Sequence, residues 1–128
     1  MKTKQTRTEG SRYYPKRYDF DPASRDAIFD EGLVCQVAFE LDGQPFILPT
    51  SYCRSGNTLY LHGSVGSHFF RQMAKGIPVC LNVTLVDGLV LARSVFHHSM
   101  NYRSVVAFGK TRLVESDQER WLAAERFV

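Results

Sequence analysis

LVCQVAFELDGQPFILPTSY, residues 33–52, is the clearest indication of how this chain folds. Two runs rich in β-branched and aromatic residues flank Asp42-Gly43. Because Asp-Gly readily adopts the positive φ angles of a two-residue turn, the stretch predicts a β-hairpin. RSGN closes the second run at residues 54–57, and TLYLH predicts a third strand over residues 58–62.

A similar pattern follows further along the chain. VCLNVTLV (residues 79–86) and LVLARSVF (residues 89–96) flank Asp87-Gly88, which predicts a second two-residue hairpin. In that register Asn82 lies opposite Arg93. SVVAFGKTRLV, residues 104–114, predicts a sixth strand.

Start and stop signals predict three helices. Asp21 and Pro22 open one that ends at Gly32, Ser67 caps one that ends at Gly76 before Pro78, and a Ser116/Glu119 capping box opens one that is still running at Val128. Six strands joined by short turns, with few helices, indicate a mainly β protein. We expect an antiparallel, Greek-key-like barrel with helices outside it.

Composition is that of one globular domain in a reducing compartment. The chain has 128 residues, of which 44% are apolar and 23% charged, which argues against a disordered chain. No apolar run reaches the roughly 20 residues that span a bilayer, and no apolar segment follows the N-terminal basic residues, as a secretory signal would require. Three widely spaced cysteines, Cys35, Cys53 and Cys80, predict buried free thiols and no metal site. We therefore expect a cytoplasmic protein.

The positive charge is concentrated at the N-terminus. Six of the 16 Lys and Arg residues lie in residues 1–17 with one acid, Glu9, so the remainder holds 10 basic and 12 acidic residues. This predicts a basic, flexible N-terminal arm over residues 1–17 and a domain over residues 18–128. Such an arm could touch nucleic acid or a membrane surface, but a short solvated tail is the commoner explanation, and we expect neither partner.

LYLHGSVGSHFFRQMAKG, residues 59–76, is a candidate anion site. Strand alternation sends Leu59 and Leu61 to the core and His62 to the opposite face. The following segment combines glycines that allow close backbone approach with hydroxyl and imidazole donors near a helix start: Gly63, Ser64, Gly66, Ser67 and His68. A phosphate can bind such a segment without a Walker sequence. A capped turn rich in Gly and Ser has the same pattern, so spacing alone leaves both readings open.

A second candidate segment is HHSMNYRSVVAFG, residues 97–109. His97 and His98 point in opposite directions in an extended chain, so they do not form a metal-binding pair. Arg103, with Ser104 beside it, could pair with a phosphate at the mouth of a strand or simply face solvent. Tyr102 could stack on a planar ligand or pack in a core. The motifs of hydrolases and nucleotide triphosphatases are absent.

Three of these segments, LYLHGS (59–64), DGLVLARS (87–94) and HHSMNYRSVV (97–106), carry a family resemblance. The chain resembles the pyridoxamine 5′-phosphate oxidase-like flavoproteins over roughly residues 13–128, in particular the branch of nitroimidazole-resistance proteins. The resemblance implies an FMN-binding split β-barrel that forms a homodimer with FMN (flavin mononucleotide) in a groove between its subunits. It also implies a small-molecule substrate.

The resemblance assigns candidate cofactor contacts to three clusters. His62, Ser64, Ser67 and His68 would hold the phosphate and ribityl region, Arg103 and Ser104 would close the other side, and the backbone of residues 49–51 would lie along the flavin ring. The full candidate set is Pro49, Thr50, Ser51, His62, Gly63, Ser64, Ser67, His68, Tyr102, Arg103 and Ser104. His62 is also the candidate proton donor to substrate, although a structural histidine bonded to the cofactor is an equal alternative.

Two departures from the family pattern qualify its activity. His68 and Phe69 stand where the oxidases have an arginine-lysine pair, so pyridoxamine 5′-phosphate oxidation is not expected. The chain also ends inside its last helix, where relatives continue into segments that complete the barrel, so we expect weaker cofactor affinity.

The predicted function is FMN-dependent oxidation and reduction of a small molecule, nitroreductase-like, with a nicotinamide nucleotide as electron donor. The alternative is a non-catalytic module on the same barrel that binds flavin, haem or pyridoxal phosphate. A third, weaker alternative is a domain tethered to nucleic acid by the basic arm.

Overall fold

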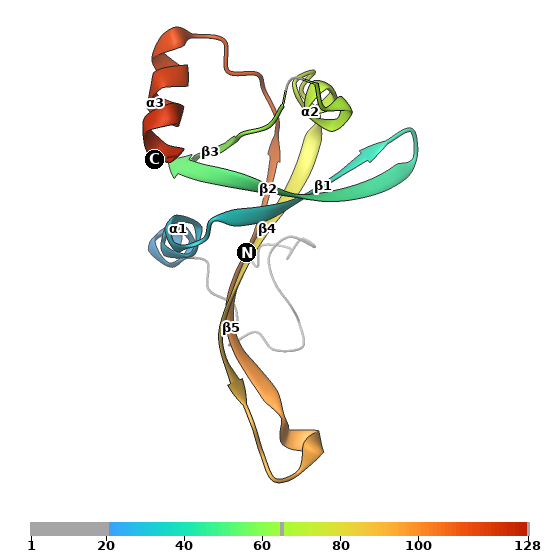
Figure 1. Cartoon of the computed structure of the whole chain (residues 1–128), viewed down its shortest axis with the longest axis vertical. Coiled ribbons are helices and arrows are strands. Elements are labelled where there is room, and N and C mark those ends of the chain that lie inside the picture. The colour runs from blue at the N-terminus through green and yellow to red at the C-terminus, as the bar shows by residue number, and fades with distance from the viewer. Residues whose placement is uncertain (1–20, 65, 128) are drawn as a thin grey trace, which may run out of the picture.

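The computed structural model describes residues 21–64 and 66–127, so the basic arm predicted over residues 1–17 lies outside the described residues. The elements in chain order are α1 (Pro22–Glu31), β1 (Val34–Leu41), β2 (Gln44–Ser55), β3 (Thr58–Leu61), α2 (His68–Met73), β4 (Pro78–Val90), the 3₁₀ helix η2 (Val95–His97), β5 (Ser99–Lys110) and α3 (Asp117–Phe127). Figure 1 shows α1 and α3 at one side of the strands and α2 near the ends of β3 and β4.

The strands form one antiparallel sheet in the order β3-β2-β1-β4-β5. The expected mainly β fold is confirmed. β3 and β5 are the two edges of the sheet, and they do not pair with each other within the described residues, so the barrel is open there. The described residues form five strands, whereas the sequence predicted six.

The first predicted hairpin is confirmed. Leu41 pairs with Gln44 across a two-residue turn, in which Asp42 has φ 51° and Gly43 has φ 80°. These are the positive angles for which Asp-Gly was read as a turn. The next reversal is equally tight, with Gly56 at φ 59° between β2 and β3.

The second predicted hairpin is wrong. β4 runs straight through Asp87-Gly88 with a bulge between Val86 and Gly88, and Asn82 pairs with Val106 of β5, not with Arg93. Gly88 is not among the glycines with positive φ, so the dipeptide does not form a hairpin turn. The chain reverses later, between Val90 and Ser99, which merges two predicted strands into β4 and leaves five.

Helix α1 begins and ends where the sequence predicts. The Asp21 carboxylate accepts from the Ala23 N–H at 3.2 Å, and the Gly32 N–H donates to the Ile28 carbonyl at 3.1 Å. The Tyr52 hydroxyl donates to the Phe29 carbonyl at 2.6 Å and joins α1 to β2. A Cβ on Gly32 would overlap that hydroxyl, so glycine is needed for this close approach.

The other two helices confirm the prediction in part. In α3, the Glu119 N–H donates to the Ser116 Oγ at 3.1 Å, which is the serine half of the predicted capping box, whereas the Glu119 carboxylate accepts from Arg112 and Tyr60. In α2, Ser67 is the N-cap residue but its side chain makes no capping hydrogen bond, so the predicted side-chain cap is wrong. Gly76 has φ 83° just beyond the end of α2, as expected of a helix stop.

The core lies on one face of the sheet. It is formed by alternate residues of β1, β2 and β4 with one residue from each of α1 and α2: Phe29, Cys35, Val37, Phe39, Tyr52, Met73, Val79, Leu81 and Val83. Leu59 and Leu61 pack against this cluster, as predicted. No helix in the described residues is long and apolar enough to cross a membrane.

The opposite face, which we call the open face, is largely exposed. Its residues alternate with the core residues along β1, β2, β4 and β5 and include Val34, Gln36, Ala38, Ile47, Pro49, Ser51, Cys80, Asn82, Thr84, Ser104, Val106 and Phe108. Ile47, Val106 and Phe108 are each more than half exposed. Further along β2, past Ser51, helix α3 covers this side of the sheet. There the Cys53 thiol lies 3.8 Å from the Ala123 carbonyl.

Candidate functional site

Two of the three predicted clusters meet at the end of β3. The Thr50 hydroxyl donates to the His62 carbonyl at 3.2 Å, and the register of β2 and β3 pairs Tyr52 with Leu61. The backbone of residues 49–51 therefore lies directly beside the start of the 62–68 segment. This adjacency is what the predicted cofactor contacts require.

Hydrogen bonds join the described residues between β3 and α2, residues 62–64 and 66–67. The Ser64 Oγ accepts from the Gly66 N–H at 3.1 Å, and the Ser64 carbonyl accepts from the Ser67 N–H at 3.0 Å. A Cβ on Gly63 would overlap the Phe70 ring, so only glycine fits there. The Ser67 hydroxyl and the His68 imidazole remain as donors at the start of α2, with His68 edge-on to Phe69 at 6.0 Å between ring centroids.

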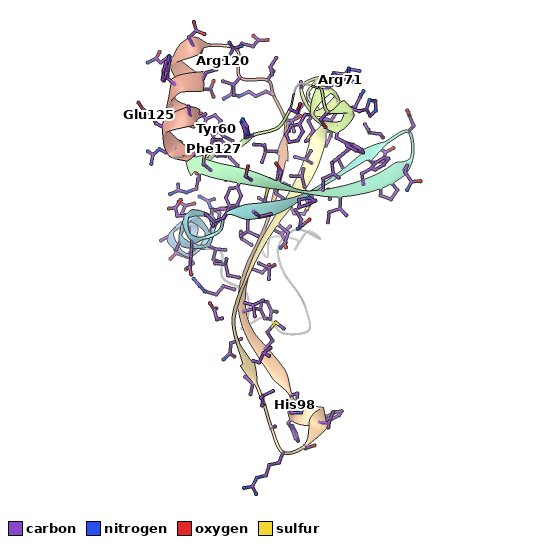
Figure 2. The ribbon with its side chains drawn as sticks, viewed as in Figure 1. Tyr60, Arg71, His98, Arg120, Glu125 and Phe127 are labelled. Atoms are coloured by element: carbon purple, nitrogen blue, oxygen red, sulfur yellow. The ribbon has the colours of Figure 1, made fainter. Side chains whose placement is uncertain are left out.

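His62 lies between the end of β3 and the end of α3. Its ring centroid is 5.8 Å from that of Phe127, at an interplanar angle of 62°. Figure 2 shows Phe127 on the turn of α3 that faces this part of the sheet, with Tyr60 nearby. The imidazole is exposed, so it can exchange a proton with a ligand or with solvent.

The third cluster divides between the two faces of β5. Tyr102 and Ser104 lie on the open face, whereas Arg103 alternates to the other face and reaches α1. Its guanidinium donates to the Glu31 carboxylate at 2.6 and 2.9 Å and to the Asp87 carboxylate at 2.9 and 2.9 Å. These bonds hold the pKa of Glu31 and of Asp87 below their usual values and raise that of Arg103. A phosphate would therefore compete with two carboxylates for Arg103.

Ser104 belongs to a polar group that the sequence did not reveal. Its hydroxyl accepts from the Asn82 Nδ2 at 2.8 Å and shares a 2.8 Å hydrogen bond with the Thr84 hydroxyl. The strand register continues this group across the sheet, because Asn82 pairs with Gln36 and Gln36 with Pro49. The wrong hairpin register placed Asn82 opposite Arg93, which is why this polar row was missed. It connects Ser104 to the 49–51 strand across the open face.

A cavity of about 460 Å³ lies on the core side between the edges of β3 and β5. The residues that line it include four apolar and two cationic side chains: Leu59, Leu61, Phe70, Met73, Lys110 and Arg112. Arg112 is paired with Glu119, which also accepts from the Tyr60 hydroxyl at 3.0 Å. None of the predicted site residues lines this cavity.

All three cysteines are free; Cys35 and Cys53 are buried, as predicted, whereas Cys80 is only half-buried. Burial raises the pKa of the Cys35 thiol to about 11 and also raises that of Cys53, so neither is a thiolate at neutral pH. No group of three or more His, Cys, Asp or Glu side chains in residues 21–64 and 66–127 has the arrangement of a metal site.

The family model for pyridoxamine 5′-phosphate oxidase matches residues 21–128. The chain belongs to this family. The family predicted from the sequence is therefore confirmed. No curated protein matches the chain.

Solved structures resemble this family member over most of its length. The FAD- and haem-binding protein from Mycobacterium smegmatis is 34% identical over 86% of this chain, with a TM-score of 0.79. The flavocytochrome Anf3 from Azotobacter vinelandii is 32% identical over 96% of the chain, with a TM-score of 0.82. A Bacteroides thetaiotaomicron protein assigned to 5-nitroimidazole antibiotic resistance is 24% identical over 85% of the chain, with a TM-score of 0.70, and shows the shared fold.

This chain is shorter than these neighbours. It covers 55% of the Mycobacterium smegmatis chain, 56% of the Azotobacter vinelandii chain and 65% of the Bacteroides thetaiotaomicron chain.

Proposed function

We propose that this chain is a flavin-binding module, that its flavin is FMN, and that the flavin lies between two copies of the chain. The single observation that carries the proposal is the contact between Thr50 and His62, which joins the 49–51 strand to the residue that follows β3, beside the open face. Two neighbours at 34% and 32% identity are described as FAD- and haem-binding and as a flavocytochrome, which supports a flavin in this fold.

The donors present suit a phosphorylated flavin. Ser64, Ser67 and His68 offer hydroxyl and imidazole groups for a phosphate, and the strand backbone at residues 49–51 offers carbonyls and amides to the edge of a ring. The polar row through Asn82 and Ser104 faces the same side. Val106 and Phe108 are exposed beside it, and a second copy would cover them.

The finer proposal is an oxidoreductase that acts on a small molecule, nitroreductase-like, with a nicotinamide nucleotide as donor. A bound flavin would supply the electron transfer. The chain would bind and orient it, and His62, exposed at the end of β3, would hold a proton at its imidazole for the reduced substrate. The free, protonated thiols of Cys35 and Cys53 suit a reducing compartment, which supports a cytoplasmic location.

Haem is the second candidate ligand, because the neighbours at 34% and 32% identity are described as an FAD- and haem-binding protein and as a flavocytochrome. In this chain the imidazoles of His62, His68, His97 and His98 are all exposed. They are available as axial ligands to iron.

An absorption spectrum from about 300 to 600 nm, taken before and after incubation with FMN or FAD and desalting, tests the cofactor. We expect flavin bands that survive desalting, with FMN retained at a higher ratio than FAD. A Soret band without flavin bands would favour haem, and a protein that retains neither would contradict the proposal. Reduction of the retained flavin by NADH or NADPH without oxygen, and its reoxidation by a nitroaromatic compound, would support the oxidoreductase; an inert flavin would support the binding module.

Ser67→Ala tests the phosphate contact without disturbing the fold. Because the Ser67 hydroxyl makes no capping bond, we expect the free energy of unfolding to change by less than about 0.5 kcal/mol. Loss of a hydrogen bond to a charged phosphate should weaken FMN binding about tenfold or more, measured by fluorescence titration.

Ser116→Ala is the matched control, because this hydroxyl does cap a helix. It should cost about 1 kcal/mol of stability with FMN affinity unchanged. Unchanged FMN affinity in Ser67→Ala would reject the phosphate role of Ser67.

A further inference from the structure

Three polar side chains on the open face are hydrogen-bonded to one another, and only Ser104 of these was among the predicted site residues. We call Asn82, Thr84 and Ser104 the polar trio. Thr84 and Ser104 lie opposite each other in the ladder of β4 and β5, and both are exposed, whereas Asn82 is half-buried. The bonds within the trio decide what kind of ligand it can meet.

The backbone of β5 fixes the orientation of the Asn82 carboxamide. Its Nδ2 donates to the Val105 carbonyl at 3.1 Å and to the Ser104 Oγ at 2.8 Å. A carboxamide oxygen at that position would face the Val105 carbonyl with no hydrogen between them, so the nitrogen must lie there. The Asn82 Oδ1 therefore lies on the other side of the group, 2.9 Å from the Thr84 hydroxyl.

The hydroxyl hydrogens of the trio then have only one arrangement. Because the Asn82 Oδ1 carries no hydrogen, Thr84 must donate to it. That bond uses the only hydroxyl hydrogen of Thr84, so the 2.8 Å bond between Thr84 and Ser104 is donated by Ser104. The Ser104 Oγ in turn accepts from the Asn82 Nδ2. The bonds form a closed ring, and every polar hydrogen of these side chains is used within the protein.

The trio can therefore accept hydrogen bonds from a ligand but has none to donate. Each of its oxygens has two acceptor positions and uses one of them in the ring. A phosphate monoester near neutral pH presents chiefly acceptor oxygens, so it finds no donor here. Arg103 turns to the other face, where it is bonded to Glu31 and Asp87. The trio thus disfavours a phosphate and suits a ligand group that donates.

Gln36 supplies the donor that the trio lacks. It pairs with Asn82 across β1 and β4 and is exposed on the same face of the sheet. Within the described residues its carboxamide makes no hydrogen bond. Side chains paired across neighbouring strands have Cβ atoms about 5 Å apart. A ligand N–H that donates to the trio can therefore have a neighbouring C=O within reach of the Gln36 amide.

Among the strand residues that the structure describes, no charged side chain on the open face lies next to the trio. Strand alternation places Glu40 and Lys110 on this face, four residues along β1 from Gln36 and six residues along β5 from Ser104. At about 3.3 Å per residue, these positions are about 13 Å and about 20 Å away. The surroundings of the trio therefore favour an uncharged ligand group.

We propose that the polar trio and Gln36 bind an uncharged amide, whose N–H donates to the trio and whose C=O accepts from Gln36. Two reactants of the proposed function carry such a group, namely the imide edge of the flavin ring and the carboxamide of a nicotinamide nucleotide. The inference rests on the proposed function and names side chains that bind and orient one of these reactants.

Binding of matched ligands to the full chain and to Thr84→Val tests the proposal. Fluorescence titration compares FMN with 3-methyl-FMN, in which a methyl group replaces the imide hydrogen. NMR titration of the chain incubated with FMN compares nicotinamide with nicotinate, which has a carboxylate in place of the carboxamide. We expect Thr84→Val to lower the affinity ratio by about fivefold or more in one pair, because it removes an acceptor and frees the Ser104 hydroxyl hydrogen.

The two ligand pairs identify the source of the amide. A lower ratio of FMN to 3-methyl-FMN affinity assigns the trio to the flavin imide, and a lower ratio of nicotinamide to nicotinate affinity assigns it to the carboxamide. Either result supports the proposal. Ratios that are unchanged in both pairs would overturn it.

Thr84→Ser is the matched control, because it keeps the hydroxyl and should keep both affinity ratios. Since residue 84 is exposed, urea unfolding should give both variants nearly the stability of the wild type. Ratios lowered equally by Thr84→Ser and Thr84→Val would show that the hydroxyl does not select the ligand, and would also overturn the proposal.

FMN retention measured on the same samples separates this inference from the proposed function. A chain that retains no FMN, but has a preference for nicotinamide over nicotinate that Thr84→Val abolishes, rejects the flavin site and supports the trio. A chain that retains FMN, with affinity ratios that Thr84→Val leaves unchanged, supports the flavin site and overturns the role of the trio.

Discussion

Asp42-Gly43 and Asp87-Gly88 are the same dipeptide between similar β-rich runs, yet one reverses the chain and the other does not. At the first, both residues adopt positive φ, and the Glu40 carboxylate accepts from the Gly43 N–H. At the second, the Asp87 carboxylate is bound by Arg103, Gly88 lacks positive φ, and the strand continues through a bulge. Asp-Gly thus permits a tight turn, and long-range partners decide whether it forms.

The two hairpins also differ in what stabilises them. The β1–β2 hairpin is anchored by a buried core. In it the ring centroid of Phe39 lies 5.7 Å from that of Phe46 and 5.8 Å from that of Phe69. The base of the β4–β5 hairpin is anchored by exposed ion pairs from Arg103. Burial contributes more free energy than exposed ion pairs, so substitutions in the two hairpins should differ in size.

The largest effect is expected from Phe39→Ala. Phe39 is 6% exposed, and its loss removes two ring contacts and leaves a cavity, which should cost about 3–5 kcal/mol of unfolding free energy. Leu33→Ala, at a side chain 79% exposed, should stay within about 0.5 kcal/mol. Urea unfolding at one protein concentration measures both. Equal losses would mean that the first hairpin is not anchored by burial.

A smaller loss of stability is expected from alanine at the glycine of the Asp42-Gly43 turn, and the glycine at the β4 bulge is the comparison. Gly43→Ala places a Cβ at φ 80° and should cost about 1–2 kcal/mol, because the left-handed region is unfavourable for L-residues. Gly88→Ala meets no atom within 4 Å and no positive φ, so it should be neutral to within about 0.5 kcal/mol. Thermal or urea unfolding measures both variants. A larger loss for Gly88→Ala than for Gly43→Ala would contradict the assigned turn and bulge.

The smallest effect concerns acid stability. Arg103 lowers the pKa of Glu31 below 4.5 and that of Asp87 below 3.8, chiefly through its hydrogen bonds to them. Their stabilising contribution is therefore present above these values and is lost as the pH falls through the lowered folded-state pKa values. Arg103→Met should cost only slightly at neutral pH, because the pairs are exposed.

The pH dependence of the urea midpoint checks the Arg103 pairs. The wild type should lose more stability than Arg103→Met as the pH falls from neutral to below 3.8. Parallel profiles would show that Arg103 does not stabilise the charged forms of Glu31 and Asp87.

Local signals predicted much of the fold and part of the candidate site. The first hairpin, the start of α1 at Asp21 and the Ser116 cap all depend on residues within a few positions of each other. The contact between residues 49–51 and 62–68 was also within reach, because β2 and β3 are joined by a tight turn. Residues close in sequence leave few alternative pairings, so local chemistry is decisive there.

The long-range arrangement depended on the folded chain. Asn82 pairs with Val106 and bonds Ser104, while Arg103 turns away from Ser104 to reach Glu31, 72 residues earlier. These contacts depend on β4 continuing through Asp87-Gly88. Reading that dipeptide as a turn shortens the predicted strand and changes the predicted partner of every residue in it. Strand alternation depends on neighbouring residues, so the sequence shows it directly. Which strand pairs with which, and in what register, depends on the free energy of contacts between distant segments, so only the tertiary structure decides it.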